Sequence, residues 1–172
     1  MSGVSLSDLD IHCAAADELP EVLSILTEAA RWARDAGVLG HWEVPYPEQW
    51  VRPSLERGEV YLVRLRDADV GTLTFRWTDP LIWGEQPADS GYVHRLAIRR
   101  SAAGLGVGAA MLQWCDDQLR KEGRRYLRLD CRSTHAGLRR YYLRAGFEIL
   151  RNATVNGMEV VLFQRAVSSD AR

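Results

Sequence analysis

Cysteine and lysine are both scarce in this chain of 172 residues. The three cysteines, Cys13, Cys115 and Cys131, are odd in number and show neither a CxxC pair nor a Cys/His ligand spacing. A disulfide framework and a structural zinc site are therefore not expected, and we predict no metal. Lys121 is the one lysine among 22 Lys and Arg residues, which we interpret as a codon bias and not as chemistry.

Long apolar runs and an excess of one charge are also missing. No apolar run reaches the ~18 residues that a membrane helix needs. Residues 1–8 lack the basic and apolar segments of a signal peptide. A formal net charge of −1 provides no basic field that could neutralise phosphates. These absences predict a cytoplasmic protein with neither a nucleic-acid nor a membrane partner.

The composition that is present, 47% hydrophobic and 26% charged, is that of an ordinary globular domain. We expect residues 1–172 to form one domain, with residues 1–8 and 168–172 frayed. Apolar periodicity and turn residues predict helices at 17–37, 47–55, 106–120 and 134–145, and strands at 9–15, 59–65, 70–77, 91–98, 126–131, 147–151 and 159–164. This order predicts an α+β fold, with a mixed, mostly antiparallel sheet of about seven strands flanked by about four helices.

A glycine-rich stretch, LAIRRSAAGLGVG from Leu96 to Gly108, joins an apolar strand to a helix. Gly104, Gly106 and Gly108 carry no Cβ, so the backbone can turn sharply and approach a ligand closely. The helix N-terminus adds unpaired N–H groups and the positive end of the helix dipole, which favour an anion. The arrangement suits a pyrophosphate, although a plain strand-to-helix turn also accounts for glycines.

Two nucleotide-binding patterns compete for this stretch. The absence of GK[ST] excludes a Walker-type site. GLGVGA matches GxGxx[G/A], and Asp130 ends the next strand, so a nicotinamide-dependent reductase is an alternative. Against it, the glycines begin five residues after the strand, and the flanking elements resemble hairpins instead of repeated βαβ units.

Two motifs give a more specific resemblance. LAIRRSAAGLGVGAAML resembles the central motif of the GNAT superfamily of acetyl-CoA-dependent N-acetyltransferases, an apolar strand followed by [QR]-x-x-G-x-[GA] at the start of a helix, with Ala103 in place of Gln or Arg. LRRYYLRAGF, from Leu138 to Phe147, is similar to the superfamily's [AL]-x-x-x-Y-x-x-x-G-F helix, and His135 stands where Asn is usual. The resemblance implies a sheet splayed at an acetyl-CoA site, an amine acceptor and, as a family property, a homodimer.

The same resemblance implies which residues hold the cofactor. The backbone of Leu96 and Ile98 would pair with its pantetheine arm, and a backbone N–H there can stabilise the developing oxyanion. His135 would donate a hydrogen bond to this arm. Arg99 and Arg100 are further candidates for the CoA phosphates, although a solvated turn explains them equally well. The complete set of predicted acetyl-CoA contacts is Leu96, Ala97, Ile98, Ala103, Gly104, Leu105, Gly106, Val107, Gly108, Ala109 and His135.

Amine acylation needs a neutral amine and a proton for the departing thiolate. Tyr142 falls on the family's tyrosine, whose neutral phenol can protonate the sulfur; packing in the core, like Tyr141, is the alternative. His94 lies two residues before Leu96, hence on the same strand face if no bulge intervenes, and can accept the ammonium proton directly or through water. Glu43 is the competing base.

Aromatic residues are the candidates for acceptor binding: Trp42, Trp83 and Tyr92. Cys131 has no histidine in its motif, which disfavours an acyl-cysteine route. We therefore predict direct attack of a primary amine on acetyl-CoA in a ternary complex. A non-catalytic acyl-CoA-binding protein is the remaining alternative, because Ala103 and His135 depart from the family pattern.

Overall fold

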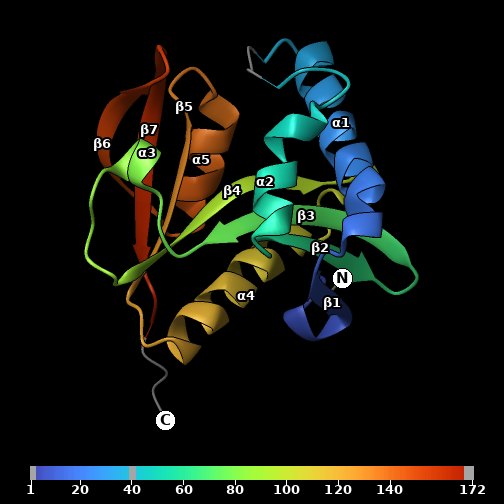
Figure 1. Cartoon of the computed structure of the whole chain (residues 1–172), viewed down its shortest axis with the longest axis horizontal. Coiled ribbons are helices and arrows are strands. Elements are labelled where there is room, and N and C mark those ends of the chain that lie inside the picture. The colour runs from blue at the N-terminus through green and yellow to red at the C-terminus, as the bar shows by residue number, and fades with distance from the viewer. Residues whose placement is uncertain (1–2, 39–41, 169–172) are drawn as a thin grey trace. The chain divides into compact units, whose positions relative to one another are not determined.

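The computed structural model describes residues 3–38 and 42–168. The strands are β1 (Leu9–Cys13), β2 (Val60–Leu65), β3 (Ala68–Arg76), β4 (Ser90–Ile98), β5 (Tyr126–Arg132), β6 (Glu148–Val155) and β7 (Met158–Ala166). The helices are α1 (Leu19–Asp35), α2 (Arg52–Glu56), α3 (Pro80–Trp83), α4 (Val107–Lys121) and α5 (Ala136–Arg144) (Figure 1). Short 3-10 turns at Leu6–Asp8, Ala16–Glu18, Glu48–Trp50 and Arg100–Ala102 complete the described elements.

The seven strands form one sheet with the order β1-β2-β3-β4-β5-β7-β6. β4 and β5 are parallel, whereas β1 with β2, β2 with β3, β5 with β7, and β6 with β7 are antiparallel. The predicted α+β fold with a mostly antiparallel sheet is confirmed. The described part of the chain contains five helices; the one without a counterpart in the sequence prediction is the single turn of α3, which begins at Pro80.

The chain divides into two compact units. The first comprises Met1–Phe75 and Arg95–Gln113, and the second comprises Arg76–His94 and Trp114–Arg172. β4 and α4 each contribute residues to both units. No helix in the described part of the chain is long and apolar enough to cross a membrane.

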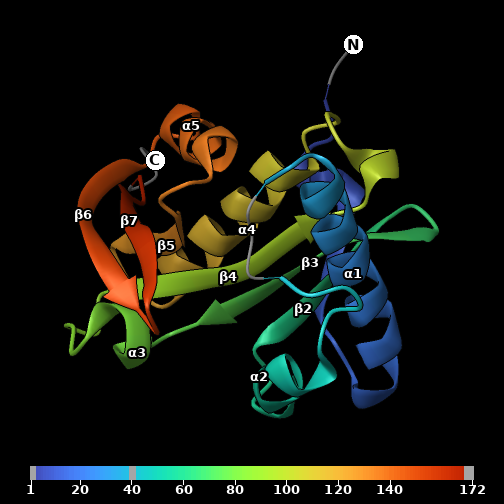
Figure 2. The ribbon, with the colours of Figure 1, turned by 90° about the horizontal axis from the view of Figure 1, so that it is seen from above.

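The core of the first unit forms between α1 and β2. The apolar residues of α1 recur at helical spacing, so one face of the helix is buried. In Figure 2 this helix runs beside β2 and β3. This core contains Leu19, Val22, Ile25 and Leu26 of α1, Val60 and Leu62 of β2, and Val51, Leu55 and Ala97.

The N-terminal segment also belongs to the first unit. Of residues 1–8, which the sequence predicts to be frayed, residues 1 and 2 lie outside the described residues; Val4 donates its N–H to Leu105 O at 2.7 Å. The Asp8 carboxylate accepts from Ser5 N at 2.8 Å and from Ser5 Oγ at 2.7 Å. These bonds lower the pKa of Asp8 and stabilise the turn Leu6–Asp8.

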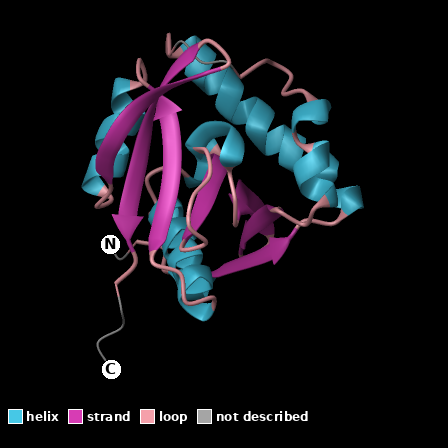
Figure 3. Cartoon of the chain, turned by 60° about the vertical axis from the view of Figure 1, so that its left-hand side comes forward, coloured by secondary structure: helices cyan, strands magenta, loops and turns pink. Residues whose placement is uncertain are grey.

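In the second unit, β5, β7 and β6 pair side by side, and α5 follows β5 (Figures 1 and 3). Leu129 pairs with Phe163 of β7, and the alternation of a strand sends the side chains of Arg128 and Asp130 to the opposite face. Leu127, Leu129 and Phe163 are fully buried. β5 therefore buries an apolar row on one face and carries charged residues on the other.

Candidate active site

The glycine-rich loop, residues 103–106, precedes α4 in the first unit. Gly104 and Gly106 have φ values of 77° and 90°, in the left-handed region that glycine adopts without strain. Within the described residues, no acceptor bonds to the N–H of either glycine. The loop is exposed, and the first turn of α4 adds N–H groups that have no intrahelical acceptor. These backbone donors at the positive end of a helix dipole fit a pyrophosphate.

The two loop glycines have different surroundings. A Cβ on Gly104 would meet no heavy atom within 4 Å, whereas a Cβ on Gly106 would lie 3.4 Å from Val4 O. The open side of the loop is therefore at Gly104. Of the other predicted cofactor residues here, Ala103, Leu105 and Ala109 are exposed, and Val107 and Gly108 are buried.

The predicted pantetheine strand is the last part of β4. Ala97 is buried in the core of the first unit, and Leu96 and Ile98 are half-buried. Arg95 has a φ of 50°, a left-handed conformation that interrupts the alternation of side chains along the strand. The expectation that His94 and Leu96 share a face required an unbroken strand, so that argument no longer holds.

The segment before α2 contains two predicted site residues. Glu43 is exposed, and it forms no ion pair or hydrogen bond within the described part of the chain. Trp42 is half-buried, with its ring edge-on to Tyr46 at 5.3 Å between ring centroids. Tyr46 in turn accepts a hydrogen bond from Arg95 Nε at 3.1 Å. Trp42 thus packs against Tyr46, and Tyr46 stabilises the left-handed Arg95 of β4 through this hydrogen bond.

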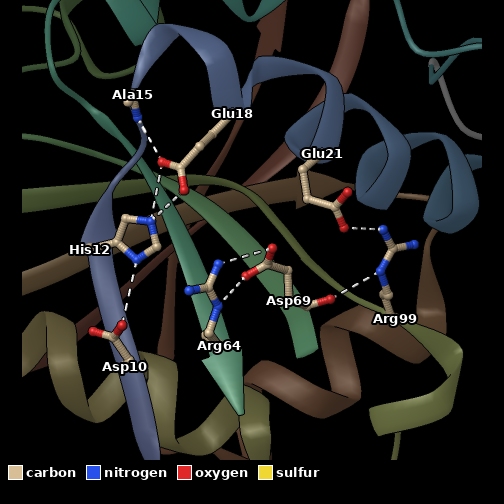
Figure 4. Close-up of polar contacts among 8 residues, drawn as sticks. All are labelled: Asp10, His12, Ala15, Glu18, Glu21, Arg64, Asp69 and Arg99. Carbon is tan, nitrogen blue, oxygen red and sulfur yellow. Dashed lines mark hydrogen bonds and ion pairs between the residues drawn. The ribbon is translucent and has the colours of Figure 1, made fainter. Parts of the chain in front are cut away.

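Arg99 is engaged in a network within the first unit (Figure 4). Its Nη2 donates to Glu21 Oε1 at 2.7 Å, and its Nε donates to Asp69 O at 3.0 Å. Nη2 also donates to Ser24 Oγ at 3.0 Å. The Arg100 guanidinium lies over the ring of Trp32, 4.4 Å from its centroid. Both side chains already have partners, which weakens the prediction that they bind CoA phosphates.

In the second unit, His94 lies between two carboxylates. His94 Nε2 is 2.8 Å from Asp79 Oδ2, so Nε2–H donates to a carboxylate that is only 2% exposed. His94 Nδ1 is 3.6 Å from Asp130 Oδ1, too far for a direct hydrogen bond. Asp79 therefore orients the ring, and Nδ1 faces Asp130 across a short gap.

Asp130 Oδ1 is buried and finds no hydrogen-bond partner among the described residues. Burial raises the pKa of the Asp130 carboxyl; nearby His94 opposes this rise and the Asp79 carboxylate adds to it. A buried carboxylate oxygen without a donor is costly, and a cationic or N–H donor from a ligand would relieve that cost.

A cavity of about 420 Å³ lies in the second unit beside Asp79, the carboxylate that accepts a hydrogen bond from His94. Its lining includes Asp79, Tyr92 and Gln86. Of the predicted acceptor-binding residues, Tyr92 lines the cavity, and Trp83 packs against Tyr92 with 5.8 Å between ring centroids. Trp83 and Tyr92 thus occupy the same region as Asp79, the partner of His94.

Tyr142 of α5 is buried, with its ring 5.7 Å from the rings of both Phe147 and Phe163. Burial raises the pKa of the phenol well above its ordinary value, and the nearby Cys131, Tyr141 and Asp130 add to the rise. The phenol therefore stays protonated at neutral pH, as a proton donor must.

His135 is the N-cap of α5. Its Nδ1 accepts a hydrogen bond from Leu138 N at 3.2 Å. Burial lowers the pKa of His135, which favours the neutral ring that this cap requires. A neutral ring that accepts at Nδ1 carries its proton on Nε2, so Nε2 is available as the donor that the sequence predicts.

Comparison with known proteins decides the family. The family model described as acetyltransferase (GNAT) family matches residues 26–147, more than half of the chain. The chain belongs to the GNAT acetyltransferase family. This acetyltransferase is 28% identical over 167 residues to the uncharacterized N-acetyltransferase YesJ of Bacillus subtilis (strain 168), covering 91% of this chain and 89% of that protein.

Solved structures share the fold of this acetyltransferase. A GNAT-family acetyltransferase from Listeria monocytogenes 4b F2365 has a TM-score of 0.75 at 22% identity, covering 92% of this chain and 94% of that one. PaiA N-acetyltransferase from Thermoplasma acidophilum, in complex with coenzyme A, has a TM-score of 0.70 at 13% identity, covering 92% and 98%. The predicted acyltransferase class is confirmed, and the nicotinamide-dependent reductase is wrong for this family.

Sequence reasoning missed three polar residues of this acetyltransferase's second unit: Asp79, Arg128 and Gln86. The sequence linked Asp130 only to the alternative of a nicotinamide-dependent reductase. A signal was available in YLRLDC, where Arg128 and Asp130 alternate with leucines and so share one strand face. No group of three or more metal-ligating side chains occurs in the described ranges.

Proposed function

We propose that this acetyltransferase moves the acetyl group of acetyl-CoA onto a primary amine by direct attack in a ternary complex. The observation that carries the proposal is the position of His94 between Asp79 and Asp130, with Asp79 also lining a cavity of the second unit. Family membership supports the reaction class, and the three residues supply groups that could bind and deprotonate the acceptor.

Acetyl-CoA supplies the acetyl group as an activated thioester. The unpaired N–H groups of Gly104 and Gly106, together with the N-terminus of α4, would bind its pyrophosphate. The complex of the similarly folded PaiA N-acetyltransferase with coenzyme A supports this assignment. The backbone of Leu96 and Ile98 would bind the pantetheine arm, as the family resemblance implies.

The amine would bind between His94 Nδ1 and Asp130 Oδ1. These two acceptors are 3.6 Å apart, so one nitrogen can lie at ~2.9 Å from both. Asp130 holds the ammonium form by charge, and Nδ1 accepts one of its protons, which leaves a neutral nucleophile. The resulting imidazolium is stabilised by the hydrogen bond from Nε2–H to Asp79. As the C–S bond breaks, Tyr142 would donate its phenolic proton to the departing thiolate, and the proton lost by the newly formed amide nitrogen would restore the phenol.

The pH dependence of kcat/KM tests the role of His94. We expect an acid limb that His94→Ala abolishes or displaces, because the unprotonated ring is the base. A free ammonium acceptor titrates as well, so the profile is repeated with an acceptor of different amine pKa. A limb that stays in place with both acceptors and also survives in His94→Ala would show that histidine is not the base; Glu43→Gln is then the next variant.

Asp79→Asn tests the orientation of the ring. This variant keeps the shape of Asp79 but removes its charge, so we expect kcat/KM to fall by ~10² and the acid limb to move. Asp67→Asn, in the exposed turn between β2 and β3, is the matched control and should keep wild-type kinetics. An Asp79→Asn enzyme with unchanged rate and profile would remove Asp79 from the mechanism.

A further inference from the structure

Arg128 of β5 is a buried cation with no carboxylate beside it. The residue is 8% exposed, and within the described part of the chain no Asp or Glu oxygen lies within 4.0 Å of its guanidinium. Its donors meet neutral acceptors: Nε bonds to Gln164 Oε1 at 2.8 Å, and Nη1 bonds to Gln86 Oε1 at 2.9 Å and to Tyr92 Oη at 3.2 Å. Buried charges are normally paired, so the Arg128 guanidinium is a candidate to bind the anionic group of a ligand.

Aromatic rings compensate the charge only in part. The guanidinium carbon lies 4.9 Å from the ring centroid of Trp83 and 5.9 Å from those of Tyr92 and Tyr126. Two of these three contacts are at the outer limit of about 6 Å for a cation–π interaction, so the rings provide no substitute for a paired anion. Nη2 donates to no described residue, which leaves one arm of a fork that suits a carboxylate or a phosphate.

The guanidinium is next to the cavity of the second unit. Gln86 and Tyr92 line that cavity, and both accept hydrogen bonds from Nη1 of Arg128. Asp79 lines the same cavity and holds His94. Arg128 and Asp130 are two residues apart on β5, about 6.6 Å along a strand. One region therefore offers a cation and, a short distance away, an unpartnered carboxylate oxygen.

We infer that the acceptor is an amine that carries an anionic oxyacid group, with its ammonium at Asp130 and His94 and its anion at Arg128. The inference rests on the proposed function for the identity of the reacting amine. Carboxylate and phosphate share the chemistry that a guanidinium recognises, so both are candidates for the anion. Arg128 determines specificity: it binds a part of the acceptor that does not react.

The wild-type enzyme provides the first test. Binding is measured by calorimetry, and acetyl transfer by kcat/KM, for 4-aminobutanoate, β-alanine and 2-aminoethyl phosphate. The same measurements are made for 4-aminobutanamide and propylamine, the counterparts that lack the anionic group and are called neutral here. We expect the anionic amines to exceed their neutral counterparts by at least about tenfold. β-Alanine against 2-aminoethyl phosphate shows which anion is preferred. Equal binding and equal rates for charged and neutral amines would overturn the inference.

Variants then test whether Arg128 is the cause. Arg128→Gln should remove the preference for the anionic amines, mainly through KM, while acetylation of propylamine persists. Arg128→Lys keeps the charge without the fork and should retain part of the preference, which protects the test if Arg128→Gln fails to fold. Arg125→Gln is the matched control, because Arg125 is exposed and stacks on Tyr126 at 5.3 Å. A preference that survives in folded Arg128→Gln would overturn the role of Arg128.

Binding and acetyl transfer, measured separately, distinguish failure of the proposed function from failure of this inference. Tight binding of anionic amines without acetyl transfer would reject the transferase mechanism and support the acceptor class. Transfer to neutral amines as fast as to charged ones would support the mechanism and reject the acceptor class. No measurable binding of any anionic amine would reject the inference.

Discussion

At the scale of single residues, burial determines what Tyr142 can do. The phenol lies among aromatic rings, and burial raises its pKa, so it carries a proton throughout the working pH range. Tyr142→Phe keeps the ring and its packing but deletes the proton; we expect turnover to fall by ~10² with coenzyme A affinity and Tm nearly unchanged. Tyr141→Phe is the control, because Tyr141 is the adjacent tyrosine and is 38% exposed.

Steady-state rates and calorimetry on both variants give the comparison. Turnover within twofold of wild type in Tyr142→Phe, at every pH tested, would mean that the phenol only packs and that the thiolate takes its proton from water. Equal losses in both variants would point to packing of α5 instead of proton transfer.

The buried carboxylate of Asp130 lowers the stability of the fold at neutral pH, although we expect activity to require it. Burial raises its pKa in the folded state, so the folded chain holds this proton more tightly than the unfolded chain, where a carboxyl titrates near ~3.9. The contribution of Asp130 to stability is therefore fully present below that value and is lost as pH rises through the folded pKa. We expect Asp130→Asn to be more stable than wild type at neutral pH and to lose activity.

Urea unfolding at several pH values measures this effect. The advantage of Asp130→Asn over wild type should shrink as the pH falls below the titration of Asp130. Asp67→Asn, at an exposed turn, should follow the wild-type curve throughout. An Asp130→Asn protein that is less stable than wild type at neutral pH would contradict the desolvation argument.

At the scale of elements, the glycine-rich loop provides a matched pair of substitutions. Gly104 and Gly123 have φ values of 77° and 65°, and a Cβ at either would meet nothing within 4 Å. Alanine at either position should cost ~1–2 kcal/mol of stability through left-handed strain. Only Gly104→Ala lies in the predicted pyrophosphate loop, so only it should weaken coenzyme A binding, by about tenfold or more.

Calorimetry with coenzyme A and thermal unfolding of both variants separate strain from binding. Similar losses of affinity in the two variants would assign the effect to stability alone. Gly106 is a poorer choice, because its Cβ would approach Val4 O, and a substitution there would disturb the N-terminal segment as well as the ligand.

Elements whose signals are local were predictable from the sequence. The β6–β7 hairpin turns at Asn156 and Gly157, with φ values of 49° and 77°, as Asn-Gly predicts. Two features lacked such a signal. The left-handed Arg95 in the middle of β4 is stabilised by a hydrogen bond to Tyr46, 49 residues earlier in the chain. α3 is a single turn with Pro at its start, below the length at which periodicity is detectable.

At the scale of the whole molecule, residues in continuous motifs were easier to predict from the sequence than residues that come from separate segments. The glycine-rich loop and Tyr142 lie in continuous motifs, so the family and its reaction class followed from them. The groups around His94 come from three separate segments, and Asp79 is 15 residues from His94 in the chain. Only the folded chain brings these residues together, so the sequence alone did not indicate that Asp79 and Asp130 flank His94.

The kinetic mechanism is also a property of the whole chain. The state of the three cysteines predicts direct transfer without an acyl-enzyme intermediate. An acyl-enzyme route needs a reactive thiolate, but burial raises the pKa of Cys131 to about 12, and burial likewise raises the pKa of Cys115. Cys13 is exposed and contacts Gly58 O. We therefore expect intersecting initial-velocity lines when acetyl-CoA and the amine are varied together, and no acetylated protein in intact-mass spectra after incubation with acetyl-CoA alone. Parallel lines together with an acetylated peptide containing Cys131 would contradict direct transfer, and Cys131→Ala would then have to abolish turnover.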